Sequence, residues 1–74
     1  MKYKVNVVIE KDKNGYYAFC PELKGCHSQG DTFEEVMNHI KEAIDLYLET
    51  MSQEEIRDAL SQEIVNTTFE VDFA

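Results

Sequence analysis

The chain has 74 residues, of which 43% are hydrophobic, and a net charge of −8. Its length allows one domain, residues 1–74, with a thin core, because so short a chain buries only about 60% of the surface that its unfolded form exposes. The negative charge repels phosphates, which argues against direct binding to nucleic acid or an anionic membrane. No stretch approaches the ~20 apolar residues that cross a bilayer, so we expect a cytoplasmic protein.

The N-terminal segment is predicted to be a strand. Tyr3, Val5, Val7 and Ile9 alternate with lysine and asparagine, and this period of two is typical of a strand with one covered face. A polar stretch ending in Asn14-Gly15 follows, and this pair tolerates positive φ, which suits a hairpin turn.

A second strand is predicted over residues 16–20. Tyr16 and Ala18 lie on one of its faces and Tyr17 and Phe19 on the other, so both faces are apolar. One face is expected to meet the core. The other is expected to form a subunit interface or an exposed aromatic patch.

A third strand and a long helix come next. Pro21 ends the second strand because it cannot donate a ladder hydrogen bond, and residues 26–30 form a short third strand. Thr32 and Glu35 match a capping box and predict a helix from there to about Thr50. Its apolar residues recur at intervals of three and four and form one stripe, made of Phe33, Val36, Met37, Ile40, Ala43, Ile44, Tyr47, Leu48 and Met51.

The last part of the chain predicts a short helix and a fourth strand. Ser52 and Glu55 repeat the capping-box pattern ahead of a short apolar set. From Val65 to Phe73, apolar residues and threonine alternate with polar ones, which predicts a strand. The predicted fold class is therefore α+β, with a four-stranded mixed sheet in the order 3-2-1-4. One long helix covers one face, and the fourth strand returns parallel to the first through a right-handed crossover.

Candidate reactive groups are few, and each has a simpler structural interpretation. Cys20 and Cys26 are expected to remain thiols in a reducing compartment, and with His27 and His39 they match zinc-ligand spacing poorly. Cys26 and His27 are neighbours on a strand and point to opposite faces, which disfavours a catalytic dyad. The strand carboxylates are Glu10, Glu70 and Asp72, and they do not form the cluster that a two-metal nuclease needs. We expect no enzyme activity, no metal and no cofactor.

Charge is unevenly divided along the chain. Up to residue 24, five lysines stand against three carboxylates, a balance of +2. From residue 25 onward, twelve carboxylates stand against Lys41 and Arg57, a balance of −10. Such a segment attracts a basic partner, although an acidic helix face is more often simply a solvated surface.

The stretch from Gly15 to Glu35 reads G-Y-Y-x-x-C-P-E-L-x-G-C-x-S-Q-G-D-T-x-E-E, and residues 40–49 read I-K-E-A-I-D-L-Y-L-E. This pattern resembles the antitoxins of the HicB type, and the resemblance covers residues 5–49. It implies a partial ribonuclease H-like fold. It also implies that the protein neutralises a HicA-type toxin, a small basic ribonuclease that cleaves mRNA, by covering the toxin's active site.

The resemblance also directs attention to possible contact residues. Glu22, Asp31, Glu34 and Glu35 lie where the family pattern is densest and are candidates for contact with a basic toxin. Tyr16 and Tyr17 are candidates for an apolar anchor, either in a toxin contact or in a homodimer, with ordinary packing as the competing interpretation.

Longer HicB-type antitoxins continue into a DNA-binding segment, and we expect no such segment and no operator binding here. The protein is expected to form a homodimer or a larger homo-oligomer. The alternative to the antitoxin is a self-associating domain without a toxin, with a structural or small-ligand-binding role.

Overall fold

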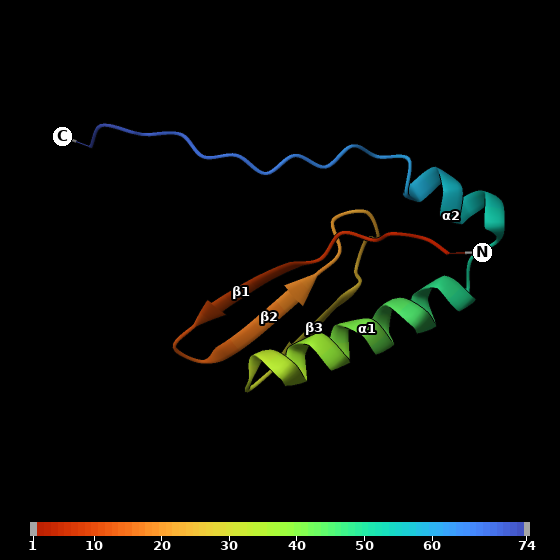
Figure 1. Cartoon of the computed structure of the whole chain (residues 1–74), viewed down its shortest axis with the longest axis horizontal. Helices are drawn as coiled ribbons and strands as arrows, with labels where there is room; N and C mark the ends of the chain where they lie inside the picture. Colours follow the sequence, from red (N-terminus) through yellow and green to blue (C-terminus); the bar gives the residue numbers. More distant parts are fainter. Residues whose placement is uncertain (1, 74) are drawn as a thin grey trace.

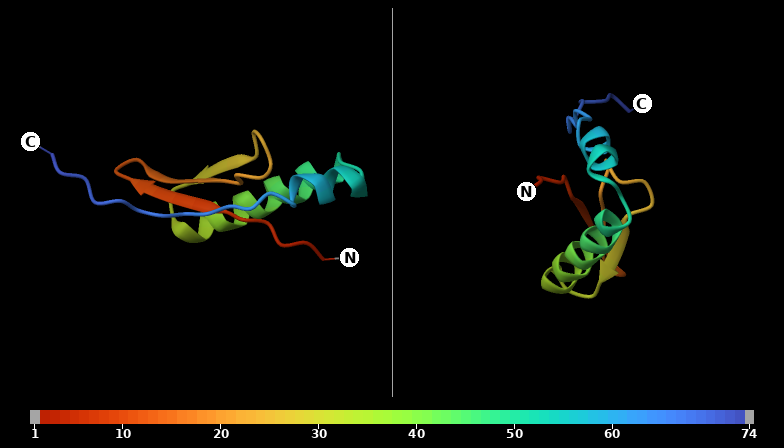
Figure 2. Two further views of the ribbon diagram at one scale, coloured as in Figure 1. Left: turned by 90° about the horizontal axis from the view of Figure 1, so that it is seen from above. Right: turned by 90° about the vertical axis from the view of Figure 1, so that its right-hand side faces the viewer.

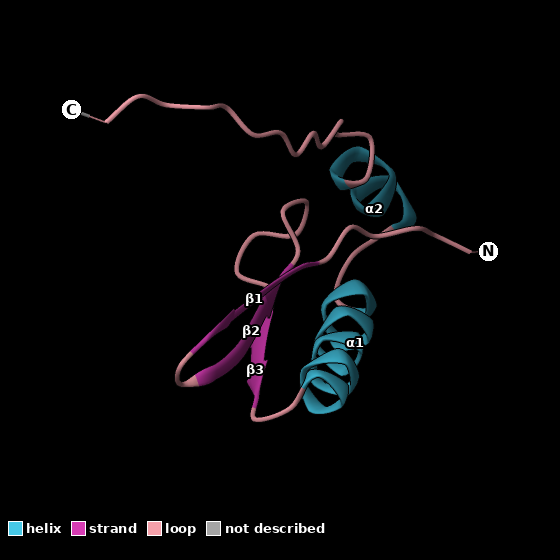
Figure 3. Cartoon of the chain, turned by 60° about the vertical axis from the view of Figure 1, so that its left-hand side comes forward, coloured by secondary structure: helices cyan, strands magenta, loops and turns pink. Residues whose placement is uncertain are grey.

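The computed structural model describes residues 2–73 and folds them into a three-stranded antiparallel sheet with two helices (Figure 1). The strands β1 (Val8–Asp12), β2 (Gly15–Phe19) and β3 (His27–Gly30) lie in the order β1-β2-β3. The helix α1 (Phe33–Glu49) packs against β3 and β2, and α2 (Gln53–Ala59) follows it. Figure 3 shows α1 along one face of the sheet, with no element on the opposite face.

The hairpin between β1 and β2 forms as the sequence predicts. Asp12 pairs with Gly15, which leaves Lys13 and Asn14 as the two turn residues. The backbone N–H of Asn14 donates to Oδ1 of Asp12 at 2.8 Å and fixes the turn. Gly15 has a φ of +130°, a conformation that residues with a Cβ rarely adopt, so glycine is required there.

The loop between β2 and β3 closes the end of the sheet. The N–H of Cys20 donates to the carbonyl of Cys26 at 3.0 Å, and Leu23 exchanges further backbone hydrogen bonds with both cysteines. Leu23 is almost completely buried, so this short loop contributes to the core. The backbone of the loop is thereby paired internally, which a buried loop requires.

Both helix starts follow their predicted caps. The N–H of Glu35 donates to Oγ1 of Thr32 at 3.1 Å, and the Glu35 carboxylate accepts from the N–H of Asp31, one residue before the cap, at 2.9 Å. In α2 the box is complete, because Ser52 and Glu55 each accept from the backbone of the other. The predicted limits of α1 are confirmed to within one residue.

The core lies between α1 and the sheet, and it is small. Gly30 allows the close approach of β3 to α1, because a Cβ there would lie 2.7 Å from the backbone nitrogen of Val36. Phe33 and Met37 belong to the predicted apolar stripe of α1 but are about half exposed, at 53% and 43%, because a sheet of three short strands cannot cover them. The buried core cluster consists of Ala18, Cys20, Leu23, Cys26, Val36 and Ile40.

The predicted fourth strand, Val65 to Phe73, is wrong for the described chain, and so is the mixed sheet of order 3-2-1-4. Residues 61–73, which we call the C-terminal segment, contain no strand and leave the sheet with three antiparallel strands. The segment runs from α2 in the same direction as β1 but clear of the sheet (Figures 1 and 2). The radius of gyration is 14.6 Å, above the ~11 Å typical of a compact domain of this length, as a projecting segment requires.

The first predicted strand is also shorter than expected. Pairing starts at Val8, opposite Phe19, although the alternating pattern begins at Tyr3. Because β2 ends at Phe19, ahead of Pro21, residues 2–7 extend beyond the end of their neighbour and have no strand to pair with.

Candidate partner-binding surface

Three carboxylates stand together where β3 leads into α1. Asp31, Glu34 and Glu35 are all exposed, and we call them the acidic corner. Their position follows from the close contact of Gly30 with α1, since the chain turns sharply there and begins a new helix. Acidic residues in the first turn complement the positive end of the helix dipole, so the corner is also compatible with a stable helix.

A shallow depression of about 300 Å³ adjoins the acidic corner. Tyr16, Asp31, Glu35 and His39 are among the residues that line it. Nδ1 of His39 lies 2.7 Å from the carbonyl oxygen of Gln29 and can donate to it, which ties α1 to β3. The depression therefore combines carboxylates, an imidazole and a phenol ring in one place.

Tyr16 and Tyr17 lie on opposite faces of the sheet, as their alternation predicts. Tyr16 meets the ring of Phe33 edge-on, with ring centres 6.0 Å apart, so it belongs to the side that α1 covers. Tyr17 contacts Phe19 and His27 on the other side, with ring centres 5.9 and 5.8 Å away. We call Val8, Tyr17, Phe19 and His27 the open sheet face. Its central ring, Tyr17, is 39% exposed.

Glu22 does not join the other candidate residues. It is only 6% exposed, and its two carboxylate oxygens accept from the backbone N–H of Asn6 at 2.8 Å and from Nδ2 of Asn6 at 3.2 Å. These bonds hold the N-terminal segment against the loop that follows β2. The carboxylate is thus already engaged within the chain, and Glu22 is a structural residue.

His39 and Phe33 lie beside the acidic corner, although the sequence pattern does not single them out as contact residues. The signal was present, because Glu35 and His39 are four residues apart on a helix and therefore share a face. His27 and Phe19 were harder to find, since their pairing across β2 and β3 depends on strand register, which no local pattern specifies.

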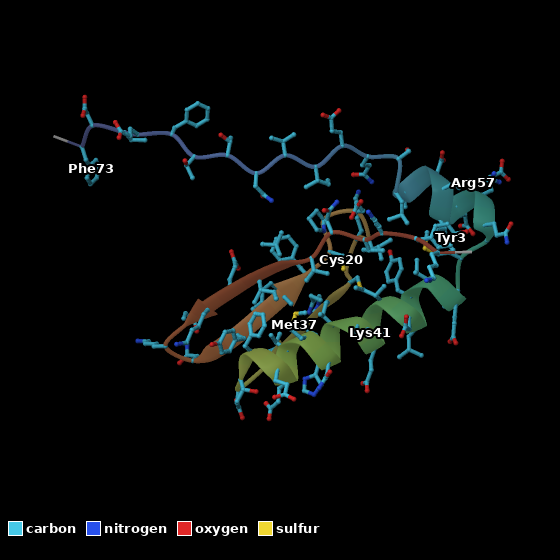
Figure 4. All side chains as sticks on the ribbon, in the orientation of Figure 1. Tyr3, Cys20, Met37, Lys41, Arg57 and Phe73 are labelled. Carbon is cyan, nitrogen blue, oxygen red and sulfur yellow. The ribbon has the colours of Figure 1, made fainter. Side chains whose placement is uncertain are left out.

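The cysteines are buried free thiols in the core, Cys20 where the sheet meets the loop (Figure 4). Burial raises the pKa of Cys20 to about 12, and Cys26 beside it adds to that effect. Across residues 2–73 no three histidine, cysteine or acidic side chains are placed to hold a metal ion.

The acidic charge extends along both helices. Lys41 of α1 forms an ion pair with Asp45 at 3.4 Å, with both side chains well exposed. Such a pair is worth little in stability because solvent screens it.

No helix in the described range is long and apolar enough to span a bilayer.

Comparison with known proteins places these features in context. Residues 3–74 match the family model described as HicB_like antitoxin of bacterial toxin-antitoxin system. A UPF0150 protein of Helicobacter pylori is 49% identical over 70 residues, which cover 95% of this chain and 97% of that protein. A UPF0150 protein of Synechocystis is 58% identical over 53 residues, covering 70% of this chain and 67% of that protein. No solved structure gives a significant match.

Proposed function

This chain belongs to the HicB-like antitoxin family, and on that premise we propose that it neutralises a small basic HicA-type toxin by covering the toxin's mRNA-cleaving site. In this proposal the protein is a binding module in the cytoplasm and not an enzyme. The single observation that carries the proposal is the acidic corner, where Asp31, Glu34 and Glu35 are all exposed at the junction of β3 and α1.

The chemistry of the toxin explains why an acidic cover suits it. An enzyme that cleaves mRNA must bind phosphates with cationic side chains. Carboxylates of another protein can form ion pairs with those side chains in place of the phosphates. The balance of −10 beyond residue 24 adds long-range attraction, which speeds the encounter of oppositely charged partners. The corner thus acts as a substitute for the RNA backbone.

The neighbouring groups give the proposed contact more than charge. Tyr16 lines the depression beside the acidic corner and supplies an aromatic surface there. Tyr17 lies on the other side of the sheet from Tyr16. A small partner that covers the acidic corner therefore need not contact Tyr17. We assign Tyr16 to the toxin contact and Tyr17 to the open sheet face.

The alternative, a self-associating domain without a toxin, is favoured by one observation. The open sheet face exposes Tyr17 beside Phe19, and aromatic side chains of this kind are common in protein interfaces. The two hypotheses differ in the role of the corner, since only the antitoxin requires its carboxylates.

The test is an RNA cleavage assay with a purified HicA-type toxin and increasing amounts of this protein. We expect cleavage to stop near equimolar protein. The double variant Asp31→Asn/Glu34→Gln should need at least about ten times more protein, because two charged contacts are lost. Glu35 is left intact since it also caps α1.

The matched control is Glu54→Gln/Asp58→Asn on α2, which removes the same charge elsewhere on the surface. It should inhibit nearly as well as the unchanged protein. Equal losses in both variants would show that only net charge matters and would overturn the role of the corner. Absence of any complex at micromolar concentration and low salt would overturn the toxin partnership itself.

A further inference from the structure

The C-terminal segment has the sequence of a strand but no strand to pair with. In residues 65–73 the apolar side chains alternate with polar ones and are highly exposed: Val65 72%, Phe69 86%, Val71 80% and Phe73 101%. Figure 4 shows Phe73 at the far end of the segment, clear of the folded body. Alternation of this kind places its apolar residues on one face, which is unfavourable in water unless something covers that face.

The strand β1 has one unpaired edge, with which such a segment could pair. This strand pairs with β2 on one side only, and no residue from 2 to 73 pairs with its other edge. Residues 2–7 prolong that edge beyond the end of β2. An unpaired edge presents backbone donors and acceptors in a row, and proteins ordinarily protect such edges.

The charges of the two segments are complementary. Residues 2–12 carry Lys2, Lys4 and Lys11 against Glu10 and Asp12, a balance of +1, and all five side chains are exposed. The C-terminal segment carries Glu63, Glu70 and Asp72, which are also exposed. Opposite net charges on neighbouring strands favour their pairing.

We propose that the C-terminal segment adds a strand to the β1 edge of a second copy of this chain, and that the second copy returns its own segment in exchange. Within one copy the segment runs in the same direction as β1 but clear of the sheet, and it does not join it (Figures 1 and 2). Reciprocal exchange gives the sheet of each copy a fourth strand. It covers the exposed apolar face of each C-terminal segment. It also enlarges a core that is thin for an isolated domain of 74 residues.

The proposal is independent of the toxin, so it is tested with the purified full chain alone. Sedimentation at several concentrations should show a species of twice 8.6 kDa. The variant Phe69→Thr/Val71→Thr keeps strand-forming residues but removes apolar surface, and it should raise the dimer dissociation constant at least about tenfold. The matched control Asn66→Thr/Thr68→Ser changes the opposite face and should shift the constant by less than about threefold.

Cross-linking identifies the route of the strand. One batch of protein carries Lys4→Cys and another carries Thr67→Cys, and the two native cysteines are buried. With a short bismaleimide, the mixture should give a covalent dimer joining one chain of each kind. Cross-linking within a doubly substituted single chain, without dimers, would show own-chain pairing and overturn the proposal.

Three other outcomes would also overturn it. These are a monomer at all concentrations, a dimer that the substitution at Phe69 and Val71 leaves unchanged, and a segment whose amides gain protection from exchange only when a HicA-type toxin is added. The second would point to the open sheet face as the contact, and the third to the toxin as the occupant.

Discussion

At the residue scale, Cys20 shows how burial, reinforced by the neighbouring Cys26, makes a thiol unreactive. Its side chain is 3% exposed, and the loss of hydration holds the pKa near 12, above its ordinary value of 9.0. Because the thiolate is the nucleophile, a thiol with so high a pKa reacts slowly. The raised pKa means that the folded state favours the protonated thiol, so its contribution to stability is complete below pH 9.0 and declines as pH rises toward 12.

Cys26 is buried as well, so we expect both cysteines to resist iodoacetamide at about pH 8 in the folded protein and to react fully in urea. Mass spectrometry of the labelled protein checks this. Rapid labelling of the folded chain would contradict the packing of the loop that joins β2 to β3.

Glu22 gives a second prediction at the same scale. Removing its carboxylate in Glu22→Ala leaves the N–H and side chain of Asn6 without their acceptor, so we expect a loss of about 1–3 kcal/mol in the free energy of unfolding. Urea denaturation measures it, with the exposed Glu49→Ala as the control expected to change stability by less than about 0.5 kcal/mol. Equal stability in the two variants would show that the hydrogen bonds from Asn6 to Glu22 do not stabilise the fold.

At the scale of the elements, features set by neighbouring residues could be predicted and those set by distant residues could not. The two caps, the hairpin turn ahead of Gly15 and the strand end before Pro21 each depend on a few adjacent side chains, and the structure confirms them. The fourth strand failed because alternation shows only that a segment suits a sheet, whereas pairing requires a free edge within reach. Glu22 failed as a surface candidate for the same reason, since Asn6, which binds it, is sixteen residues away.

The N-terminal cap of α2 makes the stability of the protein depend on pH. The backbone and hydroxyl of Ser52 lower the pKa of Glu55 below its ordinary value of 4.5, so the folded state favours the carboxylate. The stability that this provides is present above pH 4.5 and is lost as pH falls below it. Glu55→Gln should therefore be less stable than the unchanged protein at neutral pH, and the difference should shrink in acid. Thermal unfolding between about pH 3 and pH 7 tests this, and a difference that does not vary with pH would contradict the assignment.

At the scale of the whole molecule, a thin core and a divided charge define what this chain can do. Helix α1 covers one face of a small sheet, while the acidic corner, the open sheet face and the C-terminal segment remain available to partners. The antitoxin proposal uses the first of these surfaces and strand exchange uses the last. A dimer joined through β1 therefore leaves both acidic corners free, since they lie at the opposite edge of the sheet, after β3.

The most direct test of the central claim is the rate at which this protein associates with a HicA-type toxin as salt increases. If acidic residues attract the toxin in place of RNA, the association rate should fall at least about tenfold between about 0.05 and 0.5 M salt, because ions screen the attraction. The Asp31→Asn/Glu34→Gln variant should show a flatter dependence. A rate that is independent of salt, or the absence of binding at any salt concentration, would contradict the account.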